Sequence, residues 1–131
     1  MRKITYREAI KEALQEEMKA DEKVIVFGED VADPFGGSFK VTKGLSTEFG
    51  TDRVRNTPIA EAVIAGAAVG AAIAGYRPVP EIMYMDFSGS CFDAIVNQAA
   101  KIRYMSGGQV QVPVTFRTQQ GAGRSSAAQH A

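Results

Sequence analysis

Glu61 is the residue of this chain whose setting best suits acid or base chemistry. It belongs to the segment TPIAE, where Thr57 is suited to cap a helix and Pro58 to begin it. A capping-box glutamate stands three residues after the cap, and Ala60 occupies that position. Glu61 also precedes fourteen uncharged residues, 62–75, so we expect a helix buried on nearly every side. A carboxylate there needs a polar partner. The alternative is a glutamate that the helix dipole favours.

Three other side chains are of types that could take part in chemistry. His130 is the sole histidine, and an ordinary imidazole pKa of ~6.5 suits proton transfer, although a lone histidine is more often structural. Cys91 is the sole cysteine, which excludes an internal disulfide, and we expect it to be a small core residue. Glu29 follows a hydrophobic run and alone indicates only a loop or cap residue.

Composition narrows the class of protein. Of the 131 residues, 45% are hydrophobic and 23% charged, and 15 basic residues balance 15 acidic ones. These values are typical of one globular domain and give no basic surface for nucleic acid. No secretory signal and no hydrophobic stretch of membrane-spanning length is present. We therefore expect a cytoplasmic protein without nucleic-acid or membrane partners.

Hydrophobic periodicity predicts helices that alternate with short buried strands. Expected helices are 5–20 (with the capping box Thr5-x-x-Glu8), 45–49, 57–75 and 92–106, the last ended by Gly107-Gly108. Expected strands are 24–28, a brief one at Val54, 78–83 and 112–118. This order indicates an α/β domain with a mainly parallel sheet between helical layers. Active residues in such sheets gather at the carboxyl ends of the strands.

The helix expected after Glu61 is unusually small in side-chain bulk. It is composed mostly of alanine and glycine, and each interior glycine costs ~0.5–1 kcal/mol relative to alanine. Close approach of another backbone would offset that cost. The approaching backbone belongs either to the same domain or to a partner subunit, and both readings stay open.

The same segment carries a specific resemblance. TPIAEAVIAGAAVGAAIAGYRPVPEI resembles the pyrimidine-domain signature of thiamine-diphosphate enzymes, a glutamate followed by a Gly66-to-Gly70 step. The flanking motifs ITYREAI, GEDV, FGTDRV, MDF, NQAAKIRYMSGG, VPVTFR and AAQH are similar to the β subunit of 2-oxo acid and acetoin dehydrogenases. The resemblance implies a three-layer thiamine-diphosphate pyrimidine-binding fold over residues 1–131, incomplete at its C-terminal end and without the family's C-terminal domain.

The resemblance also implies roles for particular residues. Glu61 matches the glutamate that bonds a pyrimidine ring nitrogen of the cofactor, and Met83 and Phe87 match positions that line that ring. Glu29 matches a glutamate on an acidic path between paired active sites. His130 matches a histidine that binds substrate and transfers protons, but so near the chain end we expect its geometry to be unfixed.

The resemblance implies partner subunits, because motifs that the family's enzymes need are absent from this sequence. The family's diphosphate and magnesium are held by an α subunit, and this sequence has no G-D-G…N motif and no metal ligands of its own. We therefore expect an α subunit, a second β subunit and a lipoyl acyltransferase as partners, with the chain inactive alone. The implied reaction is cleavage of acetoin, pyruvate or another 2-oxo acid and passage of the acyl group to the acyltransferase. The alternatives are a pyrimidine domain of another thiamine-diphosphate enzyme and a non-catalytic interaction module.

Overall fold

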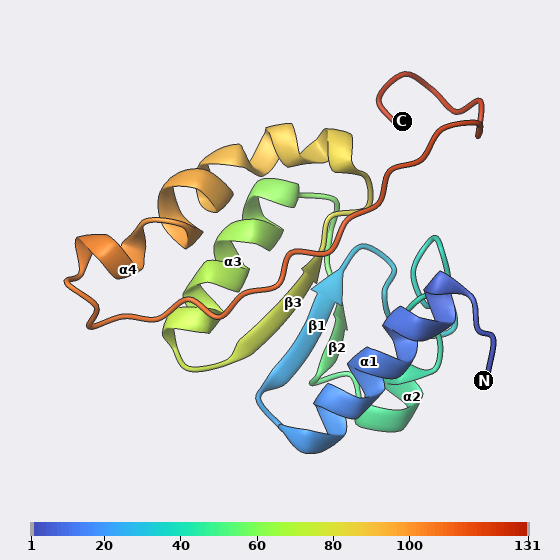
Figure 1. The fold of residues 1–131 in the computed structure, drawn as a ribbon, viewed down its shortest axis with the longest axis horizontal. Helices are drawn as coiled ribbons and strands as arrows, with labels where there is room; N and C mark the ends of the chain where they lie inside the picture. Colours follow the sequence, from blue (N-terminus) through green and yellow to red (C-terminus); the bar gives the residue numbers. More distant parts are fainter. Residues whose placement is uncertain (1, 131) are drawn as a thin grey trace.

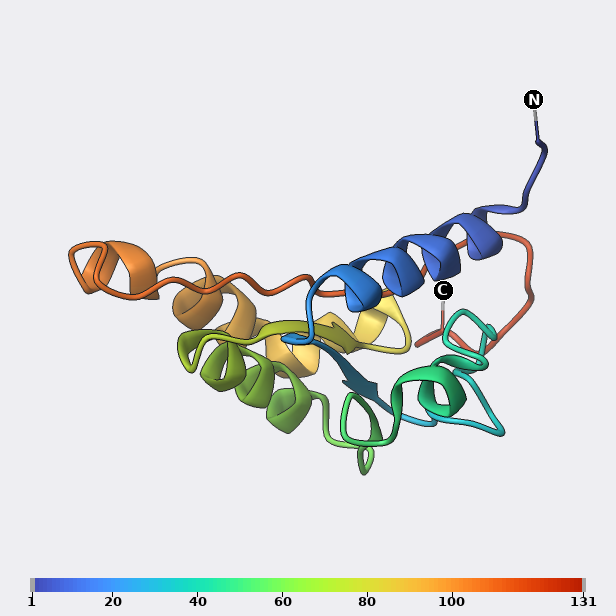
Figure 2. The same cartoon turned by 90° about the horizontal axis from the view of Figure 1, so that it is seen from below.

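A computed structural model describes residues 2–130, and over these residues the sheet has three parallel strands in the order β2–β1–β3. Strand β1 is Val24–Gly28, β2 is Val54–Asn56 and β3 is Arg77–Glu81. Helices α1 (Tyr6–Ala20) and α3 (Glu61–Ile73) lie on opposite sides of the sheet (Figures 1 and 2). The predicted α/β fold with a parallel sheet between helical layers is confirmed.

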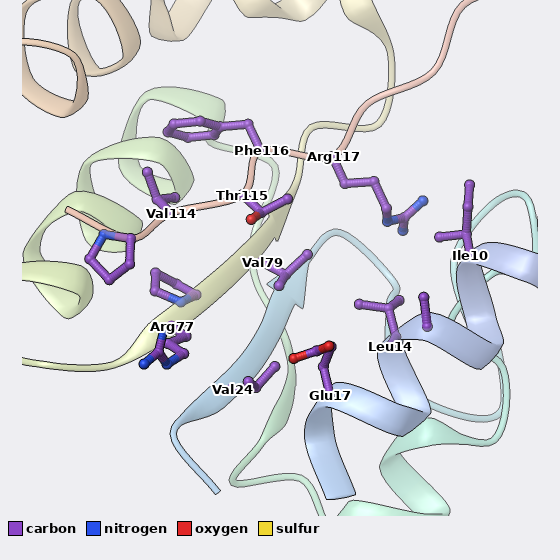
Figure 3. A pocket seen from close by; sticks show the side chains of 13 residues that line it. Ile10, Leu14, Glu17, Val24, Arg77, Val79, Val114, Thr115, Phe116 and Arg117 are labelled. Carbon is purple, nitrogen blue, oxygen red and sulfur yellow. The ribbon is translucent and has the colours of Figure 1, made fainter. Parts of the chain in front are cut away.

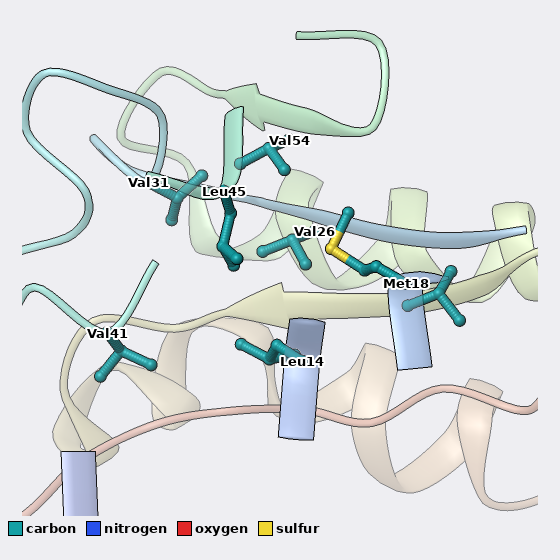
Figure 4. Packing of buried hydrophobic residues seen from close by; sticks show 8 residues of the cluster. Leu14, Met18, Val26, Val31, Val41, Leu45 and Val54 are labelled. Carbon is teal, nitrogen blue, oxygen red and sulfur yellow. The ribbon is translucent and has the colours of Figure 1, made fainter. Parts of the chain in front are cut away.

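Alternate side chains of β1 build the two cores that hold these layers together. Val26 packs with Met18 of α1 and with Leu45 of the short helix α2 (Leu45–Phe49), in the cluster shown in Figure 4. Its neighbour Phe27 points the other way and packs with Ile64 of α3. Because successive strand residues face opposite sides, a continuous hydrophobic run such as VIVFG must be covered on both faces.

The start of α1 is fixed by the predicted capping box. The backbone N–H of Glu8 donates to Thr5 Oγ1 at 3.2 Å, and the backbone N–H of Thr5 donates to Glu8 Oε2 at 2.8 Å. These two bonds satisfy amide groups that the first helical turn leaves without partners. The helix then places its apolar face against β1.

The long loop between β1 and α2, residues 29–44, is fastened by Asp33. Its carboxylate accepts hydrogen bonds from the Gly44 N–H at 2.7 Å, the Ser46 hydroxyl at 2.8 Å, and the Thr47 hydroxyl at 2.7 Å. Burial raises the pKa of Asp33, but these bonds outweigh burial and hold the pKa at about 2. The loop therefore has a fixed course past the carboxyl end of β1.

The helix that follows β2 begins later than the sequence predicts. The cap residue is Ala60, with φ −160° and no side-chain hydrogen bond, and Glu61 is the first helical residue. The prediction of Thr57 as cap and Pro58 as first helical residue is therefore wrong. Thr57 instead continues the pairing between β1 and β2, because its N–H donates to Gly28 O at 2.9 Å, and its hydroxyl bonds no helix N–H.

Helix α3 is buried on one face only, which corrects the expectation of burial on nearly every side. Its buried residues recur at helical spacing and are Ile64, Ala65, Ala68, Val69 and Ala72. The opposite face is exposed and includes Val63 at 68% exposure, Gly66 and Gly70. The lack of charge that suggested burial instead produces an uncharged exposed face.

The segment after β3 is helical in three pieces rather than one. A 3₁₀ helix, η1, spans Met85–Cys91, a π-helical turn, η2, spans Ala94–Ala99, and α4 spans Ile102–Met105. The predicted stop is confirmed, because Gly107 and Gly108 have φ of 62° and 83° and the Gly108 N–H donates to Arg103 O at 2.8 Å. Of these pieces, η1 and η2 pack against the buried face of α3, beside which they lie in Figure 1.

The strand predicted over 112–118 is present only as an extended segment beside β3. The N–H groups of Thr115 and Arg117 donate to the carbonyls of Pro78 and Pro80 at 3.1 and 2.9 Å. Those two prolines face this segment and have no N–H to return, so the ladder is reduced to a single Glu81–Arg117 bridge.

None of the described helices has the length and hydrophobicity to cross a membrane.

Candidate active site

The candidate site lies where the three strands end. Glu29 directly follows β1, Glu61 follows β2 at the first turn of α3, and Met83 and Phe87 follow β3. In a parallel sheet the carboxyl ends of adjacent strands meet at one edge. The structure therefore brings together four of the five residues that the sequence identifies, and the fifth, His130, reaches them from the last segment.

Two carboxylates interact at this edge. Glu29 is only 7% exposed, and its Oε1 has no hydrogen-bond partner among the described residues. Burial, followed by the charges of Glu61 and Asp30, raises the pKa of Glu29. Glu29 is therefore a buried carboxyl group that is harder to ionise than usual and lies within electrostatic reach of Glu61.

Glu61 stands between this carboxyl group and the small core under α3. It is half-buried, and no side-chain hydrogen bond caps the helix it begins. Burial and the charge of Glu61 raise the pKa of the Cys91 thiol. Cys91 is 2% exposed and packs with Ile64 of α3, so the prediction of a core cysteine is confirmed. The orphaned hydroxyl of Thr57 is a further buried polar atom in this region.

Aromatic rings form the other side of the site. Phe87 packs against the core under α3 and also contacts the His130 ring edge-to-face, with ring centroids 5.4 Å apart. Tyr84 contacts His130 at 4.6 Å. The Ser38 hydroxyl, from the loop 29–44, donates to Met83 Sδ at 3.2 Å. His130 is therefore packed against two rings, which differs from the expectation of an unfixed imidazole.

A buried ion pair connects β3 to the last segment of the chain. Arg117 of the last segment pairs with Glu81 at the end of β3, and both side chains are largely buried. Burial lowers the pKa of Arg117 to about 10. A Cβ added at Gly28 would lie 2.8 Å from Glu81 O. Only glycine therefore lets the end of β1 lie this close to the end of β3.

Sequence reasoning missed Tyr84 and the Glu81–Arg117 pair. Tyr84 gave no signal in the sequence, because a tyrosine next to a strand end is usually a packing residue. The Glu81–Arg117 pair did leave a signal: each partner is the only charged residue of a predicted strand, 78–83 or 112–118, and the two charges are opposite. Lone opposite charges on two neighbouring buried strands indicate an ion pair between them.

A separate groove of about 570 Å³ lies between α1 and the last segment (Figure 3). Its walls are mainly apolar and include Leu14, Val24, Val79 and Val114, with Arg117 at one end. None of the five candidate site residues lines it.

Within residues 2–130 no group of three or more histidine, cysteine, aspartate or glutamate side chains could hold a metal ion.

Fold and site together define a class: a parallel α/β domain that presents paired carboxylates and aromatic rings at the carboxyl edge of its sheet. The transketolase pyrimidine-binding-domain family matches residues 2–131, and the chain belongs to that family. A solved split-gene transketolase, described as an inactive β4 tetramer, shares the fold with a TM-score of 0.60 and 24% identity over 87% of this chain and 33% of that one.

Curated relatives confirm the resemblance to dehydrogenase β subunits. The β subunit of the pyruvate dehydrogenase E1 component of Rickettsia conorii is 55% identical over 97% of this chain and 39% of its own length. The β subunit of the acetoin:2,6-dichlorophenolindophenol oxidoreductase of Bacillus subtilis is 50% identical over 98% of this chain and 41% of its own. The chain thus spans about two-fifths of the length of these relatives.

Proposed function

We propose that this chain is the pyrimidine-binding domain of the β subunit of a thiamine-diphosphate-dependent dehydrogenase that cleaves acetoin, pyruvate or a related 2-oxo acid. The observation that carries the proposal is Glu61 on the first turn of α3, within electrostatic reach of the buried Glu29. The relatives act on pyruvate and acetoin by their names, and both are carbonyl compounds that this cofactor class handles.

The residues present fit the aminopyrimidine end of thiamine diphosphate. That ring is a flat, polar heterocycle with hydrogen-bond donors and acceptors at its edge. Glu61 and the unpartnered Glu29 Oε1 offer carboxylate oxygens to such an edge, and Phe87 and Met83 offer apolar surface to its faces. A buried oxygen without a partner in the protein is the mark expected of a group that a ligand satisfies.

Each residue then has a stated task. Glu61 accepts a hydrogen bond from a protonated ring nitrogen and so keeps the proton at that atom. Glu29, a buried carboxyl group whose pKa is raised by burial, offers a further oxygen to the ring edge within electrostatic reach of Glu61. Met83 and Phe87 orient the ring and exclude water, and His130 binds substrate and transfers protons. When bound, thiamine diphosphate supplies the carbon nucleophile that attacks the substrate carbonyl.

The remaining parts of the reaction belong to partners. The diphosphate and its magnesium ion need phosphate-binding and metal-binding groups, and we assign both to an α subunit. We further propose a second β subunit, and a lipoyl acyltransferase that receives the acyl group. We also propose a cytoplasmic location, because a single free cysteine suits a reducing compartment.

The exposed face of α3 supports assembly with a partner. A Cβ added at Gly66 or at Gly70 would meet nothing within 4 Å, so packing inside this domain does not require either glycine. Ile59 and Val63 extend the uncharged surface at 82% and 68% exposure. A bulk-free, uncharged helix face suits close contact with another chain, and a purely non-catalytic interaction module would use the same face.

Substitution of Glu61 separates these two functions. In the assembled enzyme, Glu61→Gln keeps the side-chain shape but removes the carboxylate, and we expect turnover to fall by ~10²–10⁴. Glu22→Gln, at an exposed position, serves as the matched control and should leave turnover unchanged. A loss of less than threefold in a folded, assembled Glu61→Gln enzyme would exclude the proposed role.

A further inference from the structure

The His130 ring contacts the rings of two residues that follow β3, Tyr84 and Phe87. The Tyr84 ring meets the imidazole with centroids 4.6 Å apart and planes at 82°, and the Phe87 ring meets it at 5.4 Å and 89°. Tyr84 and Phe87 also contact each other at 6.1 Å. Edge-to-face contacts of this kind fix the mutual orientation of aromatic rings.

Backbone hydrogen bonds and a further ring contact hold Tyr84 in place. The N–H of Met85, the next residue, donates to Gln119 O at 2.8 Å, and Phe87 N–H donates to Tyr84 O at 3.0 Å. On its other side Tyr84 contacts Phe39 of the loop 29–44, with centroids 5.6 Å apart. Tyr84 therefore joins the end of β3, the loop and the last segment.

No hydrogen bond between described residues orients the imidazole at its buried nitrogen. His130 Nδ1 is buried and has no hydrogen-bond partner among the described residues. A catalytic histidine usually owes its orientation to a hydrogen bond at the ring nitrogen that does not react. Here the rings of Tyr84 and Phe87 are the neighbours that can set the orientation.

We propose that Tyr84 is a positioning residue that holds the His130 imidazole beside Phe87. The inference rests on the proposed function, which gives His130 its role in substrate binding and proton transfer. It goes further by assigning a task to a residue outside the cofactor-binding set. Loss of the Tyr84 ring should leave the cofactor-facing carboxylates in place and release the imidazole.

Proton NMR of the chain tests this directly, because His130 is the only histidine and its carbon-bound ring protons are resolved without competing imidazole signals. In the folded chain these protons should be displaced by the neighbouring rings from their positions in the same chain unfolded in urea. They should also show nuclear Overhauser contacts to tyrosine ring protons. Tyr84→Leu should abolish both effects, whereas Tyr84→Phe, which keeps a ring, should retain the displacement.

Tyr104→Leu is the matched control, because Tyr104 is 90% exposed and makes no ring contact with His130. It should leave the His130 signals unchanged. Imidazole signals at their unfolded positions in the folded native chain would overturn the proposal even if Tyr84→Leu fails to fold. Retention of the displacement in folded Tyr84→Leu would overturn it as well. None of these spectra needs cofactor, so absent thiamine-diphosphate binding would refute the proposed function and leave this inference standing.

Discussion

At the scale of single residues, the proposed chemistry depends on two glutamates that the fold places within electrostatic reach of each other. Glu29 is placed by the end of β1 and Glu61 by the first turn of α3, so neither can move away without disturbing the sheet or the helix. The cost is visible in Glu29, whose pKa is raised first by burial and then by the charge of Glu61. Such strain between like charges is typical of functional sites and is usually offset elsewhere in the fold.

This arrangement predicts how stability changes with pH. A carboxyl group whose folded pKa is raised stabilises the fold fully below its unfolded pKa of ~4.3, and that contribution is lost as pH rises through the folded pKa. Glu29→Gln, which stays neutral, should therefore unfold at higher urea concentration than the native chain near neutral pH. Below about pH 4 the difference should vanish.

Glu16→Gln provides the control for this experiment, because Glu16 is exposed on α1. It should change the free energy of unfolding little, and equally at both pH values. A Glu29→Gln variant less stable than the native chain near neutral pH would show that Glu29 is ionised and stabilised by a partner, contrary to the account.

At the scale of elements, the sequence predicts those whose signals are local. The capping box of α1, the VIVFG strand, the short helix 45–49 and the Gly107-Gly108 stop all depend on neighbouring residues, and all are present. The errors lie where distant residues decide. Thr57 donates its N–H to Gly28, and Pro78 and Pro80 deprive the last segment of donors. Neither effect is visible in a local pattern.

The candidate site divides in the same way. Glu61 stands out because its neighbours fit no capping register, and the resemblance extends this to Glu29, Met83, Phe87 and His130. Tyr84 leaves no such signal, and the lone charges of Glu81 and Arg117 become a pair only because the end of β3 and the last segment lie side by side. Their roles arise from contact between segments more than thirty residues apart along the chain.

The Glu81–Arg117 pair should contribute strongly to the stability of the fold. Glu81→Gln leaves a buried guanidinium without its counter-charge, and we expect a loss of ~3–5 kcal/mol in the free energy of unfolding, measured by urea denaturation. Arg77→Gln removes the exposed Arg77–Asp21 pair and should change the free energy of unfolding little. Equal effects of the two substitutions would mean that Arg117 is satisfied without Glu81.

Helix α3 offers a contrast between its two faces. Gly70→Leu adds a side chain into open space, so the isolated chain should keep its stability, while assembly with the partner should be lost in sedimentation velocity. Ala68→Leu adds the same bulk on the fully buried face and should destabilise the chain itself by ~1–3 kcal/mol. An unchanged sedimentation profile of Gly70→Leu with the partner would show that this face is not the interface.

At the scale of the whole molecule, the domain has a candidate site at one edge of its sheet and two further surface features, the exposed face of α3 and the groove beside α1. The carboxylates and rings gather at the carboxyl edge of the sheet, the α3 face is uncharged, and the groove beside α1 lies apart from both. The chain spans about two-fifths of the length of the relatives it matches, so these relatives contain more than this domain. The account therefore makes Glu61 the acid of a site that is shared between chains.

Calorimetric titration of thiamine diphosphate with magnesium into a mixture of this chain and an α subunit that carries the diphosphate-binding motif tests the shared site most directly. The account predicts saturable heat from the mixture that exceeds the heat from either chain alone, and its loss or marked weakening with Glu61→Gln. Saturable heat that is identical with and without this chain, or no cofactor-dependent heat from a mixture that has assembled, would contradict it.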